Sequence, residues 1–235
     1  MHAMLLTWAL LLLTRRSYWA MAPVVVIMAL TRPSGLAFAL AMGLHVVHRW
    51  WTRKADPFPR HEAIASIAVT GIAGITGFAW LLIAAAVTGS LTAYTDTELA
   101  WRSAYIGYGP LVPFAGSFQG AVWWAERAGA PAGVGIVLLA VLIVAMGAAL
   151  FSPWMRRLGV DIRFWVASWL LYLLAVFFPQ SSTWRLLLPA FPALGALAVP
   201  KSPVFRVVLI AVFLVGQWWW IDGMWAVSET DWTPP

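Results

Sequence analysis

Arg32 is the first residue whose surroundings suit chemistry with an anion. It lies in a Thr-Arg-Pro-Ser-Gly segment, residues 31–35, between two apolar runs. Its guanidinium offers a planar, permanently charged fork to a phosphate, and Ser34 opens the next apolar run, where the free N–H groups of a helix start bind anions. The segment predicts a phosphate site. A plain turn, whose arginine reaches to the membrane interface, is the alternative.

A second polar segment, residues 89–102, directly follows a long apolar run. It holds two acids, two aromatics and one arginine, namely Asp96, Glu98, Tyr94, Trp101 and Arg102. Aromatic faces suit sugars, the arginine suits a phosphate, and the two carboxylates are the only candidates that we name for catalytic acid or base work. The same residues also fit an ordinary helix start with an acidic first turn. Both interpretations can hold together.

Arg185 ends a third polar segment, residues 181–185, again just before an apolar run. It can share an anionic ligand with Arg32. The alternative is an anchor at the membrane interface, formed with the neighbouring Trp184. The sequence alone does not decide whether the three arginines meet in space.

His45 and His48 lie three residues apart and therefore fall on one face of a helix. A metal site needs at least one further ligand nearby, and Asp56 and His61 on the following loop are the only neighbours of the right type. We expect a pair of histidines at the membrane interface and no metal site.

The composition indicates which elements must position these residues. Of the 235 residues, 62% are hydrophobic and 10% are charged, whereas about 25% charged residues are usual in a soluble domain. A soluble globule of this length could not bury so much apolar surface. The 15 basic residues are scattered among apolar runs and form no basic face, so nucleic acid is not an expected partner.

Eight apolar runs predict an all-α, polytopic integral membrane protein with a single membrane domain, residues 1–235, because lipid leaves no partner for an unpaired backbone. The predicted spans are residues 3–13, 18–30, 35–47, 64–87, 132–151, 164–178, 186–199 and 204–221. Several are too short to cross a hydrocarbon core of ~30 Å at ~1.5 Å per residue. Residues 88–131 form a long loop outside the cytoplasm, with an interfacial helix within residues 109–125.

The positive-inside rule sets the predicted orientation. If residues 31–35 join two short spans, most basic residues lie in the cytoplasm, whereas Arg32, Arg102, Arg127 and Arg185 lie outside. If residues 18–48 form one span, this bias reverses and Arg32 lies inside the bilayer. We therefore expect a helical hairpin, in a protein of a bacterial plasma membrane whose two termini are both extracytoplasmic.

Three segments, in this order, resemble elements of the PIG-V-like mannosyltransferases of the GT-C glycosyltransferase superfamily. Residues 29–36, ALTRPSGL, resemble the A-T-R-P-x-G-L element of that family, and residues 89–102 resemble its small-aromatic stretch followed by a Trp-Arg pair. Residues 184–192, WRLLLPAFP, resemble its late R-x-L-L-P-x-x-P element. The resemblance extends from about residue 5 to residue 220.

The resemblance implies transfer of a hexose, usually mannose, from a polyprenyl-phosphate sugar to an extracytoplasmic acceptor. The residues that it implies for binding the donor are Arg32, Ser34, Tyr94, Trp101, Arg102 and Arg185. The family carries a catalytic acid in its first outer loop, but no outer acid precedes Asp96 here, so this acid is missing or comes from a partner chain that supplies the amino-terminal half. The residues indicate no certain cofactor, and a divalent cation stays open.

Two other functions fit the same features. A transporter or lipid-binding membrane protein also arranges broken helices around a polar cavity, and it would move or hold a membrane lipid without transferring a sugar. A non-catalytic subunit of a membrane complex would use the same surfaces to bind a second chain.

Overall fold

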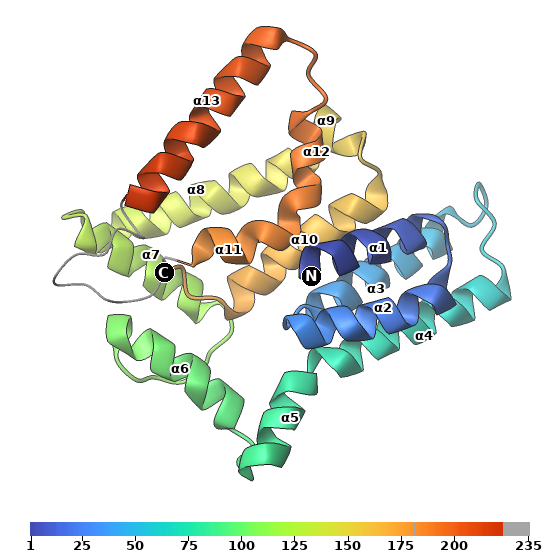
Figure 1. Ribbon diagram of the computed structural model, residues 1–235, viewed down its shortest axis with the longest axis horizontal. Coiled ribbons are helices and arrows are strands. Elements are labelled where there is room, and N and C mark those ends of the chain that lie inside the picture. The colour runs from blue at the N-terminus through green and yellow to red at the C-terminus, as the bar shows by residue number, and fades with distance from the viewer. Residues whose placement is uncertain (181, 223–235) are drawn as a thin grey trace.

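The computed structural model describes residues 1–180 and 182–222, and their regular secondary structure is helical (Figure 1). In chain order the helices are α1 His2–Thr14, α2 Tyr18–Thr31, α3 Gly35–Thr52, α4 Arg60–Gly77, α5 Ala79–Thr88, α6 Ala93–Ile106, α7 Ala115–Arg127, α8 Ala132–Leu150, α9 Pro153–Arg156, α10 Val160–Val176, α11 Thr183–Leu187, the 3₁₀ helix η1 Leu188–Ala193, α12 Leu194–Leu197 and α13 Pro203–Trp220. The prediction of an all-α fold is confirmed.

Three segments are long and apolar enough to cross a membrane: Arg60–Thr88, Ala132–Leu150 and Pro203–Trp220. α1 and α2 are apolar as well but shorter. These helices support a membrane protein, and eight crossings stay a prediction. The predicted outer position of the carboxyl terminus concerns residues 223–235, which lie outside the described part of the chain.

The predicted span at residues 186–199 is not one continuous helix. The segment is divided among the end of α11, η1 and α12. Pro189 and Pro192 lack the N–H groups that an α-helix needs in its interior, so the chain takes the tighter 3₁₀ path between them. Its apolar side chains, Ala190 and Phe191 among them, pack against the buried core.

The long segment at residues 88–131 also differs from its prediction. It holds two helices, α6 and α7, where we expected one interfacial helix. α7 occupies most of the predicted stretch. α6 follows Thr92 as its N-cap residue and has Asp96 in its first turn, which is the acidic helix start that the sequence indicates, whereas Glu98 lies beyond that turn.

The core lies among α1, α2, α3, α4 and α10. Its largest fully buried side chains include Trp165, Trp169, Phe38, Met21 and Met42. α13 stands apart in Figure 1, and aromatic rings contact it near its two ends, at Trp154–Phe205 and Trp184–Trp220. The exposed apolar faces of α8 and α13 are suited to lipid.

The turn at residues 31–35 separates α2 from α3, as the predicted helical hairpin requires. Gly35 then meets Gly77 at the end of α4 so closely that a Cβ on Gly35 would lie 2.6 Å from the Gly77 Cα. Only glycine permits backbones to approach in this way. The contact fixes the turn that carries Arg32 against the junction of α4 and α5.

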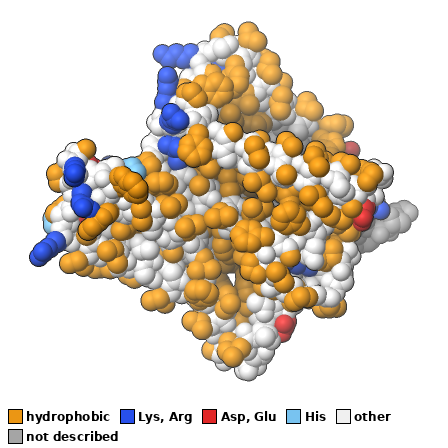
Figure 2. Space-filling model, turned by 180° about the vertical axis from the view of Figure 1, so that it is seen from behind, with side chains coloured by type: hydrophobic (Ala, Val, Ile, Leu, Met, Phe, Trp, Pro, Cys, Tyr) orange, Lys and Arg blue, Asp and Glu red, His pale blue; other side chains and the backbone are white. Residues whose placement is uncertain are grey.

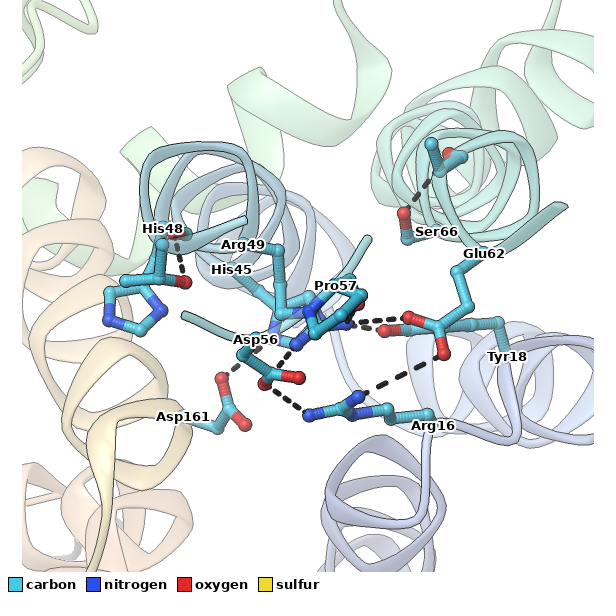
Figure 3. A network of polar contacts seen from close by, with 12 residues as sticks. Arg16, Tyr18, His45, His48, Arg49, Asp56, Pro57, Glu62, Ser66 and Asp161 are labelled. Carbon is cyan, nitrogen blue, oxygen red and sulfur yellow. Dashed lines mark hydrogen bonds and ion pairs between the residues drawn. The ribbon is translucent and has the colours of Figure 1, made fainter. Parts of the chain in front are cut away.

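At the other end of α2, α3 and α4, away from the turn at residues 31–35, a network of ion pairs holds the helices together (Figure 3). Arg49 of α3, whose side chain is 5% exposed, binds Asp56 and donates a hydrogen bond of 2.7 Å to Glu62 of α4. Arg16, in the turn between α1 and α2, also binds Asp56. It does so at a φ of 56°, a left-handed conformation that favours glycine.

His45 belongs to the same end of the molecule and is buried inside the protein, while its predicted depth at the membrane interface stays a prediction. It is 3% exposed, with its Nδ1 2.7 Å from Asp161 of α10 and its Nε2 2.9 Å from the Tyr18 hydroxyl. Because an ionised carboxylate only accepts, Nδ1–H of His45 donates to Asp161. The histidine thus links α2, α3 and α10, which the spacing to His48 did not indicate.

Gly35→Ala should lower the free energy of unfolding by about 1–3 kcal/mol, because the added methyl group forces α3 and α4 apart. The matched control is Gly71→Ala on α4, where a Cβ meets nothing within 4 Å. The midpoint of thermal unfolding in detergent measures both. A Gly35→Ala variant as stable as the Gly71→Ala control would contradict the close packing.

Asp56 should make the folded protein less stable at acid pH. The hydrogen bond from Arg16, with the charges of Arg16 and Arg49, holds the pKa of Asp56 below its usual range. Because the folded pKa lies below the unfolded value of about 3.9, the stabilisation is present above about pH 4 and is lost as the pH falls through the folded pKa. Between pH 6 and pH 3, the midpoint temperature of thermal unfolding should fall more steeply for the native protein than for Asp56→Asn. A Glu126→Gln control, on the exposed end of α7, should behave like the native protein; parallel curves for all three would refute this role.

Candidate functional site

A cavity of about 440 Å³ lies at the Arg32 end of the helices. Its walls come from the turn at residues 31–35, the junction of α4 and α5, one face of α6 and the last two turns of α10. Apolar surface makes up most of the lining, and a few polar groups converge on it. Cavities of this size and character are typical of sites for small ligands.

Arg32 is half-buried and lines the cavity. Its guanidinium donates one hydrogen bond of 3.1 Å to the backbone carbonyl of Arg185. Burial, and then the charge of Arg185, lowers the pKa of Arg32. Both causes reflect positive charge held without enough compensation, and an anion in the cavity would relieve it.

Arg102 is the second cation on the cavity and is 7% exposed. Its guanidinium donates to the carbonyl of Val176 at the end of α10. Burial lowers the pKa of Arg102, and the negative charge of Glu98 opposes this shift. The arginine is thus held in place by α10 while its charge is only partly balanced.

Tyr94, Glu98 and Arg102 recur at every fourth residue and therefore share one face of α6, which lines the cavity. Burial, and then the charge of Glu98, raises the pKa of Tyr94, so its hydroxyl stays protonated and able to donate. Glu98 is the one carboxylate among the described residues that line the cavity. Both predicted acids are exposed, but Asp96 is not part of the lining, so only Glu98 belongs to the cavity.

Two aromatic residues of α10 complete the site and were missed by the sequence analysis. Trp169 and Tyr172 line the cavity with their rings 5.6 Å apart. The indole N–H of Trp169 donates a 3.0 Å hydrogen bond to the carbonyl of Leu186, which fixes the ring. Their spacing along α10, with Trp165 four residues earlier, was the available signal, but core packing explains that spacing equally well.

The other predicted residues lie near the cavity but not on it. Trp101 is 61% exposed, because it lies about 100° around α6 from Arg102. The Arg185 side chain is exposed and donates to the hydroxyl of Ser182. It contributes to the site through its backbone carbonyl and its charge, both of which act on Arg32.

Ser34 has a structural place in the turn. Its hydroxyl is 2.9 Å from His2 Nε2 and its backbone N–H donates to the carbonyl of Arg32. The N–H group that we predicted to bind an anion is therefore already used. In the described part of the chain, no group of three or more His, Cys, Asp or Glu residues could hold a metal ion.

Comparison with protein-family models, with curated proteins and with solved structures found no match to this chain. The cavity therefore has to be interpreted from its own residues. It combines two cations, one carboxylate, half-buried tyrosine side chains and the hydrogen-bonded ring of Trp169. Two cations in one cavity suit an anionic ligand.

Proposed function

We propose that this cavity binds the phosphate and sugar of a polyprenyl-phosphate hexose, with mannose as the leading candidate. The chain then acts as a GT-C-type glycosyltransferase, or as part of one. The observation that carries the proposal is that Arg32 and Arg102, far apart in sequence, line one mostly apolar cavity together with Glu98. A donor with a charged headgroup and a long lipid tail needs this pairing of cations and apolar walls.

The reaction replaces one bond at the anomeric carbon of the sugar. An acceptor hydroxyl oxygen attacks this carbon, the bond from the carbon to the phosphate oxygen breaks, and polyprenyl phosphate leaves with the bonding electrons. Glu98 takes the proton of the acceptor hydroxyl. Arg32 and Arg102 stabilise the charge that grows on the departing phosphate, an effect that is strong where water is excluded.

The orientation of the chain belongs to the same proposal. Arg16, Arg49 and Asp161 lie at one end of the helices and Arg32 at the other. Basic side chains gather along one edge in Figure 2, and we assign that edge to the cytoplasm. The cavity then opens on the extracytoplasmic side, where the acceptor is, and the remaining apolar helices complete about eight crossings.

Arg32→Ala should weaken binding of the donor more than Arg127→Ala does. A buried, charge-assisted contact contributes about 1.5–3 kcal/mol, which corresponds to a loss of roughly 10- to 150-fold. Arg127 is exposed at the end of α7 and does not line the cavity. Binding of a polyprenyl phosphate in mixed micelles measures the effect, and equal losses for both variants would contradict the assignment of Arg32.

Glu98→Gln should lower the rate of sugar transfer by about 100-fold or more, while polyprenyl phosphate binding stays within a factor of about two. Asp96→Asn is the control, since it removes a charge two residues away but outside the cavity. If transfer survives in Glu98→Gln, a partner chain supplies the acid. If the native protein binds the lipid but transfers no sugar, the transporter or lipid-binding alternative replaces the enzyme.

A further inference from the structure

The end of the molecule opposite the cavity carries surplus positive charge. Lys and Arg side chains gather there along one edge in Figure 2. Two segments at this end, the turn between α1 and α2 and the connection from α3 to the start of α4, carry five exposed cations: Arg15, Arg16, Arg53, Lys54 and Arg60. Most of them lie where helices begin or end, close to the boundary of the apolar helix surfaces.

The acids of this end are already used inside the protein. Asp56 and Glu62 bind Arg16 and Arg49, so two carboxylates balance two guanidinium groups. Asp161 binds His45. Among the described ion pairs, none joins a carboxylate to the remaining cations, Arg15, Arg53, Lys54 and Arg60.

A recess of about 360 Å³ opens within this basic end, between the turn of α1 and α2 and the first turn of α4. Its polar lining comes from Arg16, Ser17, His61 and Glu62. The carboxylate of Glu62 is compensated by Arg49 at 2.7 Å. Arg15 and Arg60 are exposed and are the chain neighbours of Arg16 and His61, although neither lines the recess itself.

The recess also carries an exposed apolar side chain. Trp19 lines it and is 63% exposed. Apolar side chains of this size favour acyl chains, and tryptophan favours the depth of the headgroups. A phospholipid whose headgroup lies at Arg16 and His61 therefore has its glycerol region beside Trp19.

We propose that this recess binds the phosphate headgroup of an anionic phospholipid from the leaflet at the basic end. Arg15 and Arg60 supply the charge, and Arg16, Ser17 and His61 supply hydrogen bonds. The indole of Trp19 packs against the glycerol region. The site lies at the far end of α2 from Arg32 and does not depend on the function proposed for the cavity.

The test compares dioleoyl phosphatidylglycerol with dioleoyl phosphatidylcholine, by native mass spectrometry of the full chain released from mixed micelles. The native protein should bind the anionic lipid about tenfold more tightly. Arg15→Gln/Arg60→Gln should reduce this preference to about twofold or less. The matched control, Arg53→Gln/Lys54→Gln, removes the same charge from the end of α3 and should keep the preference. Arg15→Lys/Arg60→Lys should keep it too.

The outcomes separate the alternatives. If both glutamine variants lose the preference for the anionic lipid equally, the binding is due to a diffuse basic surface and the proposed site is overturned. Displacement of the lipid by millimolar inorganic phosphate overturns it in favour of a free-phosphate site. Equal binding of the two lipids by the native protein refutes it outright. Sugar transfer and polyprenyl phosphate binding at the cavity should be unchanged in Arg15→Gln/Arg60→Gln.

Discussion

The helices are arranged around one buried positive charge, the guanidinium of Arg49. A charge removed from water is tolerated only when it is paired and hydrogen-bonded, because an unpaired one costs several kcal/mol. Asp56, the carbonyl of Pro57 and Glu62 are partners of its two terminal nitrogens, whereas its buried Nε has none. Arg16 extends the network to the turn between α1 and α2. The constraint fixes four helices at one end, and their opposite ends carry the turn with Arg32.

In the cavity at the opposite end, the arginines are not fully compensated by carboxylates. Arg49 has two carboxylates, whereas Arg32 and Arg102 bind mainly backbone carbonyls, and Glu98 compensates only part of their charge. Buried or half-buried cations without full compensation mark a candidate site for an anion. The same physical rule thus accounts for a structural network at one end and for the proposed binding site at the other.

Local patterns allowed some of this to be predicted from the sequence. Pro33 and Gly35 indicated the turn between α2 and α3. Tyr94, Glu98 and Arg102 lie at every fourth residue, a spacing that could have placed them on one face of α6, but we did not make that prediction. The pairing of His45 with Asp161 could not be predicted, because it depends on how α3 packs against α10, more than a hundred residues later. Trp169 escaped for the same reason, since a ring on a cavity and a ring in the core have the same spacing.

The most direct test of the account is a structure of the protein with a polyprenyl-phosphate mannose bound. The account predicts that the phosphate lies within hydrogen-bond distance, about 2.7–3.2 Å, of the guanidinium groups of Arg32 and Arg102, with the sugar beside Glu98 and Trp169. A phosphate bound elsewhere, with this cavity filled by side chains or by lipid tails alone, would contradict it.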